Sequence, residues 1–439
     1  MFCRSTALSS KGFSQVFMYL LELYCMEPKY PWPVNVLLGV VEGFYGPPWG
    51  WVERLSFVEF LSRVGLNAYI YGPKWDPYHR EWWRAPYGEG FLDGLSMLVE
   101  AGLKYGVEVV FAVSPGLDVD YSSESDALAL VRKLSRVMEL GIDSVAVFLD
   151  DIPSVLRGRG FRTLAEAQAH LVNRVLRELR PRSLILCPTY YYGIREDYLR
   201  ELGSKLDPEV RVMWTGMWVA SHRISEEDLT RVAEVLGRKP FIWDNYPVND
   251  YFTVNGLTRL HIGPVKGRVR GLTRYVSGYV ANLANQPELS KVPVYTIAEA
   301  LQSEGYNPDR SLEQAIDSLV NRSARYYFKR FAEFNKATFM DLNEETVTRE
   351  NSDEVLEVVR ELRDRLSNRE LLREVEPVLS KMESIARYAR GEVQTLSWRV
   401  QTAGEYDPPI TAERMMSDVF GVVARRIPWY SSAYRKPWG

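Results

Sequence analysis

Two adjacent carboxylates, Asp150 and Asp151, stand at the end of an apolar run, Ser144 to Leu149, that is rich in strand-forming residues. A strand that is buried on both faces shows no alternation of polar and apolar residues, so this run predicts a buried strand. Aspartate is a poor strand former and normally stands where strand pairing ends. The pattern therefore indicates acid chemistry at the carboxyl end of a strand. The alternative is a solvated pair that caps the next turn.

Neighbouring carboxyl groups suit a division of acid and base roles. Like charges at close range raise one of the two pKa values, so one group keeps its proton near neutral pH while the other stays ionised. Asp150 and Asp151 suit that division, one as the ionised member and the other as the protonated one. The two groups titrate as a coupled pair.

Composition excludes several other classes of function. The 439 residues contain 54 basic and 57 acidic side chains, and a net charge of -3 gives no bulk attraction for nucleic acid or an anionic membrane. The aromatic content of 13% suits the apolar faces of sugars as well as an ordinary core. The four histidines lack metal-ligand spacing, so we expect structural roles for them, with no metal and no cofactor.

The first residues carry no strong targeting signal. The apolar stretch from Val16 to Leu21 is too short to span a membrane and has no clear cleavage site after it. Three scattered cysteines favour a reducing compartment. These features predict a cytoplasmic protein, with a weak signal peptide as the alternative.

The two aspartates belong to a longer alternation of strands and helices. The predicted strands are Val36–Gly43, Ala68–Lys74, Glu108–Ser114, Ser144–Asp151, Leu184–Tyr191, Arg211–Thr215, Phe241–Tyr246 and Leu260–Val265. The predicted helices between them are Glu53–Val64, Phe91–Tyr105, Ser125–Leu140, Leu164–Leu179 and Glu226–Leu236. Eight strands separated by helical segments predict a (β/α)8 TIM barrel.

Polar and aromatic residues gather at the carboxyl ends of these strands. They are Glu42, Lys74, Asp150, Asp151, Tyr191, Thr215, Trp243, Asp244 and Asn245. Because active sites of such barrels are built at that end, we expect these side chains to converge on one mouth.

The alternation ends near residue 308, and a helical domain is predicted after it. Ser311 with Gln314 resembles a capping box that opens a helix to about Met340. Further predicted helices are Asp353–Leu366, Arg369–Ala389 with a kink or break at Pro377, and Thr411–Ile427. The predicted division is an N-terminal extension (1–33), a barrel (34–308) and an α-helical C-terminal domain (309–439). The aromatic tail from Pro428 to Trp438 predicts docking on its own domain or on a second subunit, which would give a homodimer.

An ordered set of motifs between residues 36 and 310 resembles glycoside hydrolase family 84, the O-GlcNAcases and related β-N-acetylglucosaminidases. The motifs are Gly39 to Trp49; Tyr69 to Lys74 with Asp76 to Arg80; Ser114 to Asp118; Phe148 to Asp151; Cys187 to Thr189; Trp214 to Gly216; Ile242 to Asn245 with Asn249 to Tyr251; and Gly263 to Arg268. The resemblance implies a TIM barrel, in agreement with the strand count.

The resemblance assigns a role to each catalytic and acetamido-binding residue. It implies that Asp151 is the general acid and base and that Asp150 holds the acetamido N–H of the substrate. Tyr191 would assist the acetamido group and the oxazoline formed from it. Trp243 would line the acetamido pocket, with Asn245 close to the reacting end.

The remaining implied residues bind the rest of the sugar. Gly43 would offer its carbonyl oxygen to a ring hydroxyl, and Lys74 would reach the hydroxyls on the same side. Asp250 and Asn282 would hold the far hydroxyls. Two more residues would form the pocket wall: Thr215 and Val219.

These roles predict a retaining exo-β-N-acetylglucosaminidase that acts by substrate assistance. The amide oxygen of a 2-acetamido sugar serves as an internal nucleophile, so no enzyme carboxylate needs to attack the anomeric carbon. The expected partner is a GlcNAc-bearing glycoprotein or glycoside, and protein serine or threonine is one candidate for the attached group. The alternative is a non-catalytic barrel that binds GlcNAc glycans and uses the helical domain for interaction.

Overall fold

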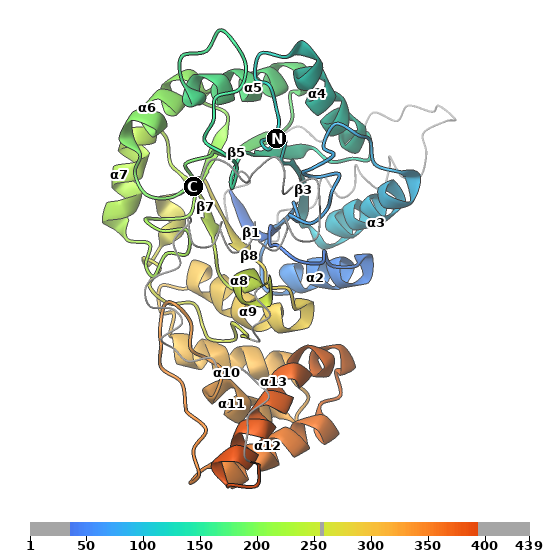
Figure 1. The fold of residues 1–439 in the computed structure, drawn as a ribbon, viewed down its shortest axis with the longest axis vertical. Helices are drawn as coiled ribbons and strands as arrows, with labels where there is room; N and C mark the ends of the chain where they lie inside the picture. Colours follow the sequence, from blue (N-terminus) through green and yellow to red (C-terminus); the bar gives the residue numbers. More distant parts are fainter. Residues whose placement is uncertain (1–35, 255–258, 394–439) are drawn as a thin grey trace, which may run out of the picture. The chain divides into compact units, whose positions relative to one another are not determined.

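Eight parallel strands close into a barrel in the computed structural model, which describes residues 36–254 and 259–393 (Figure 1). The strands are β1 (Leu37–Glu42), β2 (Ala68–Tyr71), β3 (Glu108–Val113), β4 (Ser144–Phe148), β5 (Ser183–Cys187), β6 (Arg211–Trp214), β7 (Phe241–Asp244) and β8 (Gly278–Asn282). Each strand pairs with the next along the chain, and β8 closes on β1 with Gly278 opposite Leu37. The predicted TIM barrel is confirmed.

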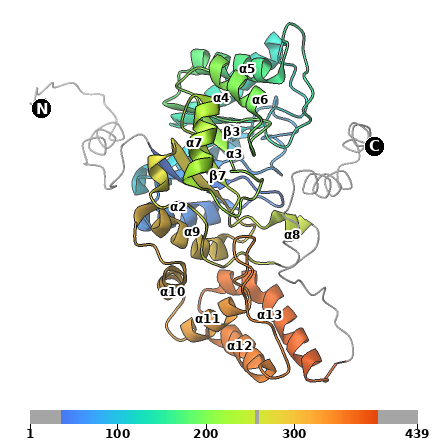
Figure 2. The same ribbon diagram turned by 90° about the vertical axis from the view of Figure 1, so that its left-hand side faces the viewer.

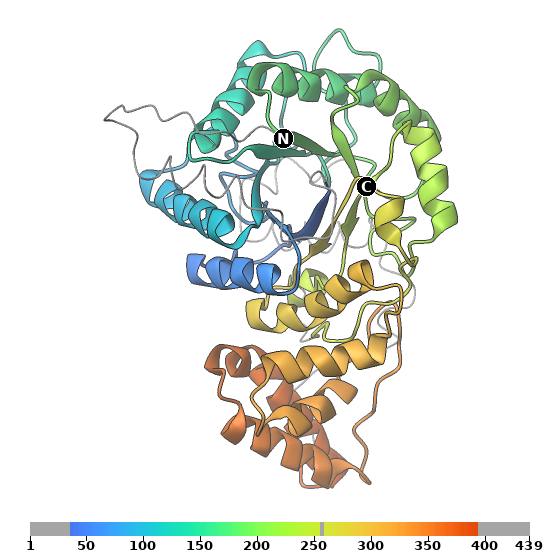
Figure 3. The ribbon, with the colours of Figure 1, turned by 180° about the vertical axis from the view of Figure 1, so that it is seen from behind.

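Helices follow the strands and form a ring around the barrel (Figures 1 and 3). They are α2 (Trp51–Arg63), α3 (Glu89–Tyr105), α4 (Glu124–Met138), α5 (Leu164–Leu179), α6 (Glu196–Lys205), α7 (Glu226–Leu236), the short α8 (Asp250–Val254) and α9 (Pro287–Gln302). The sequence reasoning did not identify α6 or α9. Two prolines stand in α9, Pro287 at its start and Pro293 inside it, so its pattern is a poor match to an uninterrupted helix.

The strands contain almost only apolar residues because both of their faces are covered. Alternate side chains, among them Ala68, Ile70, Ala146 and Phe148, fill the barrel interior. The intervening side chains face the ring of helices. This alternation decides which residues at the strand ends can enter the mouth of the barrel.

The prediction that Leu260–Val265 is the eighth strand is wrong, because β8 is Gly278–Asn282. Leu260 and Ile262 are buried, but they pack into a hydrophobic cluster with the helices that follow the barrel. The main chain at Gly263 also runs so close to that of Lys336 that a β-carbon there would lie 2.2 Å from the carbonyl oxygen. Residues 260–265 are therefore apolar because they pack against these helices, and not because they pair in the sheet.

Four helices follow the barrel within the described residues: α10 (Pro308–Leu319), α11 (Arg325–Glu333), α12 (Ser352–Arg365) and α13 (Arg369–Ala389) (Figure 2). The single helix expected to run to Met340 is divided in two, because the chain turns at Asn321, whose amide donates to Ser323 and to the carbonyl of Arg365. The expected capping box at Ser311 is also wrong, since Asn307 caps α10 by accepting from the Arg310 N–H. The helix α13 continues through Pro377.

The helices α10 to α13 share a hydrophobic cluster with α9 and with the chain before β8. Leu289 and Val292 of α9 belong to this cluster. In addition, the carboxylate of Glu374 in α13 accepts the N–H groups of Glu288 and Leu289 at the start of α9. The described residues from Leu37 onward belong to one compact unit, and the division at residue 308 stays a prediction. The extension 1–33, the helix Thr411–Ile427 and the aromatic tail lie outside the described residues.

Candidate active site

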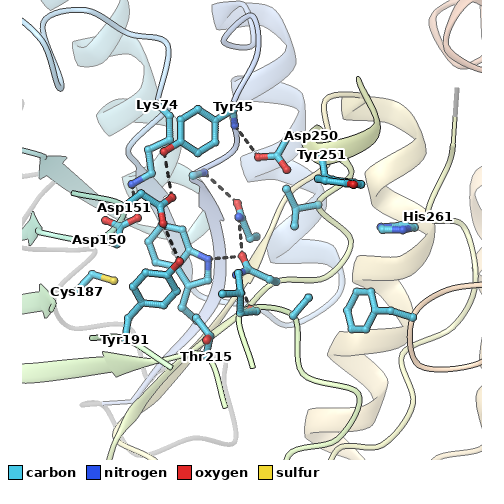
Figure 4. A pocket seen from close by; sticks show the side chains of 18 of the residues that line it. Tyr45, Lys74, Asp150, Asp151, Cys187, Tyr191, Thr215, Asp250, Tyr251 and His261 are labelled. Atoms are coloured by element: carbon cyan, nitrogen blue, oxygen red, sulfur yellow. Dashed lines mark hydrogen bonds and ion pairs between the residues drawn. The ribbon is translucent and has the colours of Figure 1, made fainter. Parts of the chain in front are cut away.

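A pocket with an open volume of about 630 Å³ lies at the carboxyl ends of the strands (Figure 4). Its lining residues are Gly43, Tyr45, Lys74, Asp150, Asp151, Cys187, Tyr191, Thr215, Val219, Ala220, Trp243, Asn245, Val248, Asp250, Tyr251, Phe252, His261, Asn282 and Phe339. Every residue to which the family resemblance assigns a role is among them. The structure therefore brings this whole set into one cavity, although their chemical roles stay predictions.

The two aspartates enter the pocket where β4 ends. The Leu149 N–H still donates to the carbonyl of Cys187 in β5, at 2.8 Å, and strand pairing then stops. Asp151 adopts a φ of 49°, in the left-handed region that residues other than glycine rarely enter. Consecutive strand residues point to opposite faces, but this turn brings the Asp150 and Asp151 side chains to the same pocket.

Asp150 forms an ion pair with Lys74, whose Nζ lies 2.5 Å from Oδ2. Both side chains are buried, and Nζ also lies over the rings of Phe148 and Trp243, 5.3 Å and 5.5 Å from their centroids. The second carboxylate oxygen of Asp150, Oδ1, is buried and accepts no hydrogen bond from any residue that the structure describes. One acceptor in the pocket is therefore unused.

Asp151 accepts hydrogen bonds from two tyrosines. The Tyr191 hydroxyl lies 2.7 Å from Oδ1 and the Tyr45 hydroxyl 3.0 Å from Oδ2. Burial, and next the charge of Asp150, raise the pKa of Asp151, while Lys74 acts in the opposite direction. Asp151 therefore holds its proton to higher pH than an exposed aspartate does.

A hydrogen-bonded network fixes the floor of the pocket. The Gly43 N–H donates to Oδ1 of Asn282, whose amide donates to Oδ1 of Asn245 at 2.9 Å. The same Asn245 oxygen accepts from the indole of Trp243 at 2.8 Å, and the Asn245 amide donates to the carbonyl of Val219 at 2.7 Å. The ends of three strands are thereby linked. Only glycine fits at position 43, since a β-carbon would lie 2.4 Å from the Trp243 ring.

Asp250 lines the pocket beside Tyr45 (Figure 4). Its Oδ2 accepts the Tyr45 N–H at 2.8 Å. Burial raises the pKa of Asp250 to about 6, and the N–H groups of Tyr45 and Tyr251 act in the opposite direction. Tyr45 therefore contacts two acidic residues of the pocket, Asp151 through its hydroxyl and Asp250 through its main chain (Figure 4).

Thr215 and Val219 form the wall that follows β6. The Thr215 N–H donates to the carbonyl of Tyr191 at 2.9 Å, and its hydroxyl donates to the carbonyl of Trp218 at 2.8 Å. The hydroxyl of Thr215 thus has a structural partner, which fits the predicted role in the pocket wall.

Two of the polar residues at the strand ends do not enter the pocket. Glu42 pairs with Arg54 and accepts from the Tyr69 hydroxyl, while Asp244 pairs with Arg268. The expectation that all these side chains converge is therefore wrong for Glu42 and Asp244. Each follows an interior residue by one position, so the strand alternation turns it outward to the helices.

Several lining residues were not predicted for the site: Tyr45, Cys187, Ala220, Val248, Tyr251, Phe252, His261 and Phe339. Tyr45 stands two residues after Gly43 in a motif that carried the resemblance, so that motif could have identified it. His261 was expected to be structural, and its ring does lie against the carbonyl of Pro247, at 3.1 Å. No local signal marks Phe339, because it belongs to the segment after the barrel.

Residues 336–345, between α11 and α12, bring Phe339 to the pocket. The carbonyl of Phe339 contacts Nδ1 of His222, and Glu344 forms a buried ion pair with Arg259 at 2.9 Å. Lys266 pairs with Asp341 at 2.5 Å. Arg259 also donates to the carbonyl of Ala337 at 3.0 Å, so the segment is tied to the barrel chain on both sides of Phe339. Part of the pocket wall comes from outside the barrel.

No group of three or more histidine, cysteine, aspartate or glutamate side chains is placed to hold a metal ion within residues 36–254 and 259–393. In the same ranges, no helix is long and apolar enough to cross a membrane.

Comparison with known proteins gives one consistent family. The model of the β-N-acetylglucosaminidase family matches residues 38–333. The proteins named Protein O-GlcNAcase from Rattus norvegicus and Mus musculus are each 35% identical over 298 residues, which cover 65% of this chain and 32% of theirs. This chain thus matches about a third of the length of these curated relatives.

Solved structures agree. A mutant of the Thermobaculum terrenum O-GlcNAc hydrolase superposes with a TM-score of 0.68 at 34% identity, over 91% of this chain and 85% of that one. The structure named CpGH84B gives a TM-score of 0.71 at 29% identity, over 90% and 74% of the two chains. The family resemblance read from the motifs is confirmed, and this chain belongs to the β-N-acetylglucosaminidase family.

Proposed function

We propose that the protein is a retaining exo-β-N-acetylglucosaminidase, which hydrolyses terminal β-linked GlcNAc by substrate-assisted catalysis through an oxazoline. The unused oxygen of Asp150 is the observation that carries this proposal. Lys74 fixes one oxygen of this carboxylate and leaves the other buried, which suits acceptance of an amide N–H. A buried acceptor without a donor is costly, so a ligand that supplies the donor is favoured.

In the first step, the acetamido oxygen of the substrate attacks the anomeric carbon. Asp150 accepts the amide N–H and stabilises the positive charge that develops on the acetamido group. Asp151 donates its proton to the glycosidic oxygen as the bond to the anomeric carbon breaks. The raised pKa of Asp151 supports this role, because the acid must still hold its proton at neutral pH. The products are the free alcohol and the oxazoline in its protonated, oxazolinium form, whose N–H still donates to Asp150.

In the second step, water attacks the anomeric carbon of the oxazoline. Asp151, now ionised, accepts a proton from this water, and the ring opens to restore the acetamido group. Two inversions at the anomeric carbon give net retention. The Tyr191 hydroxyl keeps its proton, because burial, and next the charge of Asp151, raise its pKa well above the usual value. It therefore remains a hydrogen-bond donor throughout.

The enzyme supplies mainly position. A well-oriented internal nucleophile has an effective molarity of about 10⁵ to 10⁸ M, so holding the acetamido group against the anomeric carbon provides much of the acceleration. The network of Gly43, Asn282, Asn245 and Trp243 is a rigid floor for that purpose. Asp250, which also lines the pocket, would hold the far hydroxyls of the sugar, as the resemblance implies.

The direct test compares an aryl β-N-acetylglucosaminide with the matching aryl β-glucoside. We expect hydrolysis of the first and almost none of the second, because the glucoside lacks the nucleophile. Comparable rates on both would reject substrate assistance. Binding of GlcNAc without hydrolysis of either compound would favour the alternative, a non-catalytic glycan-binding barrel. The variant Asp150→Asn, purified in parallel, measures any contaminating activity.

A stable thiazoline mimic of the oxazoline gives a second test. It resembles a species that the site binds more tightly than the ground state, so it should compete with substrate. Retention of substrate hydrolysis at saturating mimic would contradict an oxazoline intermediate.

We further propose protein serine and threonine as the attached groups. The names of the rat and mouse relatives support this choice. Release of GlcNAc from a glycosylated serine peptide should exceed release from a chitin fragment or a hyaluronan-like polymer at equal concentration. Preference for a glycan fragment or for the polymer would overturn it. The cytoplasmic location and the homodimer stay predictions.

A further inference from the structure

Arg80, in the loop between β2 and α3, reaches the main chain of the predicted acid. The side chain is buried, with 1% of its surface exposed. One guanidinium nitrogen donates to the carbonyl oxygen of Asp151 at 2.6 Å, and another donates to the hydroxyl of Ser114 at 3.2 Å. The guanidinium thus spans the ends of β3 and β4.

The preceding residue fixes the loop that carries Arg80. The carbonyl of His79 accepts the Ser114 N–H at 2.9 Å, and Nδ1 of His79 lies 2.8 Å from the carbonyl of Ala112. Burial lowers the pKa of His79 well below its usual value, so the ring is neutral and Nδ1 carries the proton for that contact. The main chain at Arg80 is therefore anchored on β3.

The contact matters because Asp151 is strained. A residue other than glycine held in a rare backbone region, as Asp151 is with its φ of 49°, persists only when its surroundings enforce it. Tyr45 and Tyr191 hold the carboxyl group of Asp151, but a carboxyl group can rotate while the backbone relaxes. Arg80 holds the carbonyl group, on the other side of the Cα atom.

There is also an electrostatic reason why Arg80 contacts the carbonyl oxygen of Asp151 and not its carboxylate. A guanidinium placed against a carboxylate lowers its pKa by about 1 to 3 units, which would make a poor general acid. Arg80 contacts the carbonyl oxygen instead, so it restrains the residue with less effect on the proton. Lys74, from the same loop, pairs directly with the carboxylate of Asp150, the group that must stay ionised.

We propose that Arg80 is a positioning residue that holds the main chain of Asp151 in its left-handed conformation and so aims the carboxyl group at the leaving oxygen. This inference rests on the proposed function, since it assigns a geometric requirement to the general acid. It predicts that loss of Arg80 harms proton donation more than sugar binding.

The test uses two variants and two substrates. Arg80→Met removes the guanidinium, and Arg80→Lys keeps a positive charge but cannot donate to both oxygens in fixed geometry. The substrates are an alkyl β-N-acetylglucosaminide, whose leaving group needs a proton, and the dinitrophenyl compound, whose leaving group does not. The kcat/KM value reports the first step for both.

For Arg80→Met we expect kcat/KM to fall about 10²-fold on the alkyl compound and less than about tenfold on the dinitrophenyl compound, because a displaced acid loses most of its contribution. For Arg80→Lys we expect an intermediate loss with the same preference. Equal losses on the two substrates in both variants would overturn the proposal, because a general structural defect does not depend on the leaving group.

The pH profile separates charge from position. The charged groups around Asp151 are Asp150, Lys74, Arg80 and Asp250, together with the Tyr45 and Tyr191 hydroxyls. The charge of Arg80 lowers the pKa of Asp151, so Arg80→Met should move the alkaline limb of kcat/KM to higher pH. Arg80→Lys should leave that limb in place while still slowing the alkyl substrate. A limb that moves as far in Arg80→Lys as in Arg80→Met would contradict the proposal, because lysine keeps the positive charge.

A matched control exists at the opposite end of the barrel. The guanidinium of Arg238 donates to four main-chain carbonyl oxygens before β6, those of Gly203, Leu206, Asp207 and Val210. Arg238→Met should lower the melting temperature without changing the ratio of the two kcat/KM values.

If Arg80→Met does not fold, the ratio of the two kcat/KM values in Arg80→Lys decides alone. Failure of the wild type to hydrolyse the N-acetylglucosaminide would refute the proposed function, whereas an active wild type with unselective Arg80 variants refutes only this inference.

Discussion

Asp150 and Asp151 are neighbours in sequence but have different surroundings. Asp150 has a cation on one oxygen and no described partner on the other. Asp151 has two tyrosine hydroxyls and a raised pKa. The left-handed turn at Asp151 gives each carboxyl group its own surroundings within one pocket. Different environments are what allow one residue type to serve in two roles.

The two aspartates should therefore be separable by leaving group. Asp151→Asn removes the proton donor, so kcat/KM on an alkyl glycoside should fall about 10² to 10⁴-fold while the dinitrophenyl compound is much less affected. Its kcat should still fall, since Asp151 also activates water for the second step, and azide, which needs no base, should partly restore it. Asp150→Asn should slow both substrates at the first step and resist azide. Preferential rescue of Asp150→Asn by azide would exchange the two assignments.

Asp250 should link stability to pH. Its folded pKa of about 6 is above the ordinary value of 3.8, so the folded state binds more protons between these values and this group favours folding as the pH falls. Relative to wild type, Asp250→Asn should thus gain up to about 3 kcal/mol of stability between pH 4 and pH 8. Urea unfolding at both pH values measures the difference. A pH-independent difference would mean that the pKa of Asp250 is ordinary.

At the scale of elements, the strand ends show what sequence can and cannot predict. Apolar runs that stop at polar residues located β4, β5 and β7, although each predicted strand runs past the observed end, and β5 ends at Cys187 and not at Tyr191. The prediction for the eighth strand failed, because Leu260–Val265 is apolar for another reason, its burial against the helices after the barrel. Asn282 was still assigned to the site, since its place came from the family motif and not from the strand pattern.

The sequence also does not predict which way a side chain at the end of a strand points. Glu42 and Gly43 are adjacent, but Glu42 turns to Arg54 while Gly43 lies in the pocket. The alternation of side chains along a strand tells which residues face the barrel interior only when one interior residue is already known. A single sequence does not show which face of the strand is interior. The pairing of Arg80 with the carbonyl of Asp151 joins positions 71 residues apart, which no local pattern reveals.

A substitution at Gly43 tests the close contact between the end of β1 and Trp243 of β7. Gly43→Ala places a methyl group where the Trp243 ring lies, so the indole must move and its hydrogen bond to Asn245 must lengthen. A displacement of this kind can cost about 10² in rate, and we expect that loss in kcat/KM on the aryl N-acetylglucosaminide. Gly88→Ala is the control, because nothing lies within 4 Å of its new methyl group. Similar activities of the two variants would show that the indole position is not required.

At the scale of the whole molecule, residues that follow the barrel contribute to the pocket and to the packing around it. Phe339 lines the pocket although it follows α11. Glu374 of α13 binds the start of α9, and the cluster around Leu289 continues into α10 to α13. Contacts of this kind make the helices a support for one side of the pocket.

The buried ion pair of Arg259 with Glu344 is the place to test that support. Glu344→Gln removes the negative charge that pairs with the guanidinium of Arg259, and breaking a buried pair of this kind costs about 3 to 5 kcal/mol. We expect this loss in urea unfolding, together with a raised KM for the aryl N-acetylglucosaminide. Glu370→Gln, which breaks an exposed pair with Arg373, should cost less than about 1 kcal/mol. Equal effects of the two substitutions would mean that residues 336–345 do not support the pocket.

The contacts of residues 336–345 also bear on how the protein is made. A chain emerges from the ribosome with its N-terminal part first, and domains generally fold as units. The stretch that leads into β8 depends on partners that are synthesised later, since Arg259 needs Glu344 and Lys266 needs Asp341. The last quarter of the barrel therefore cannot reach its final packing when β8 leaves the exit tunnel. We expect the nascent chain to gain protease resistance only after the segment beyond α11 has emerged.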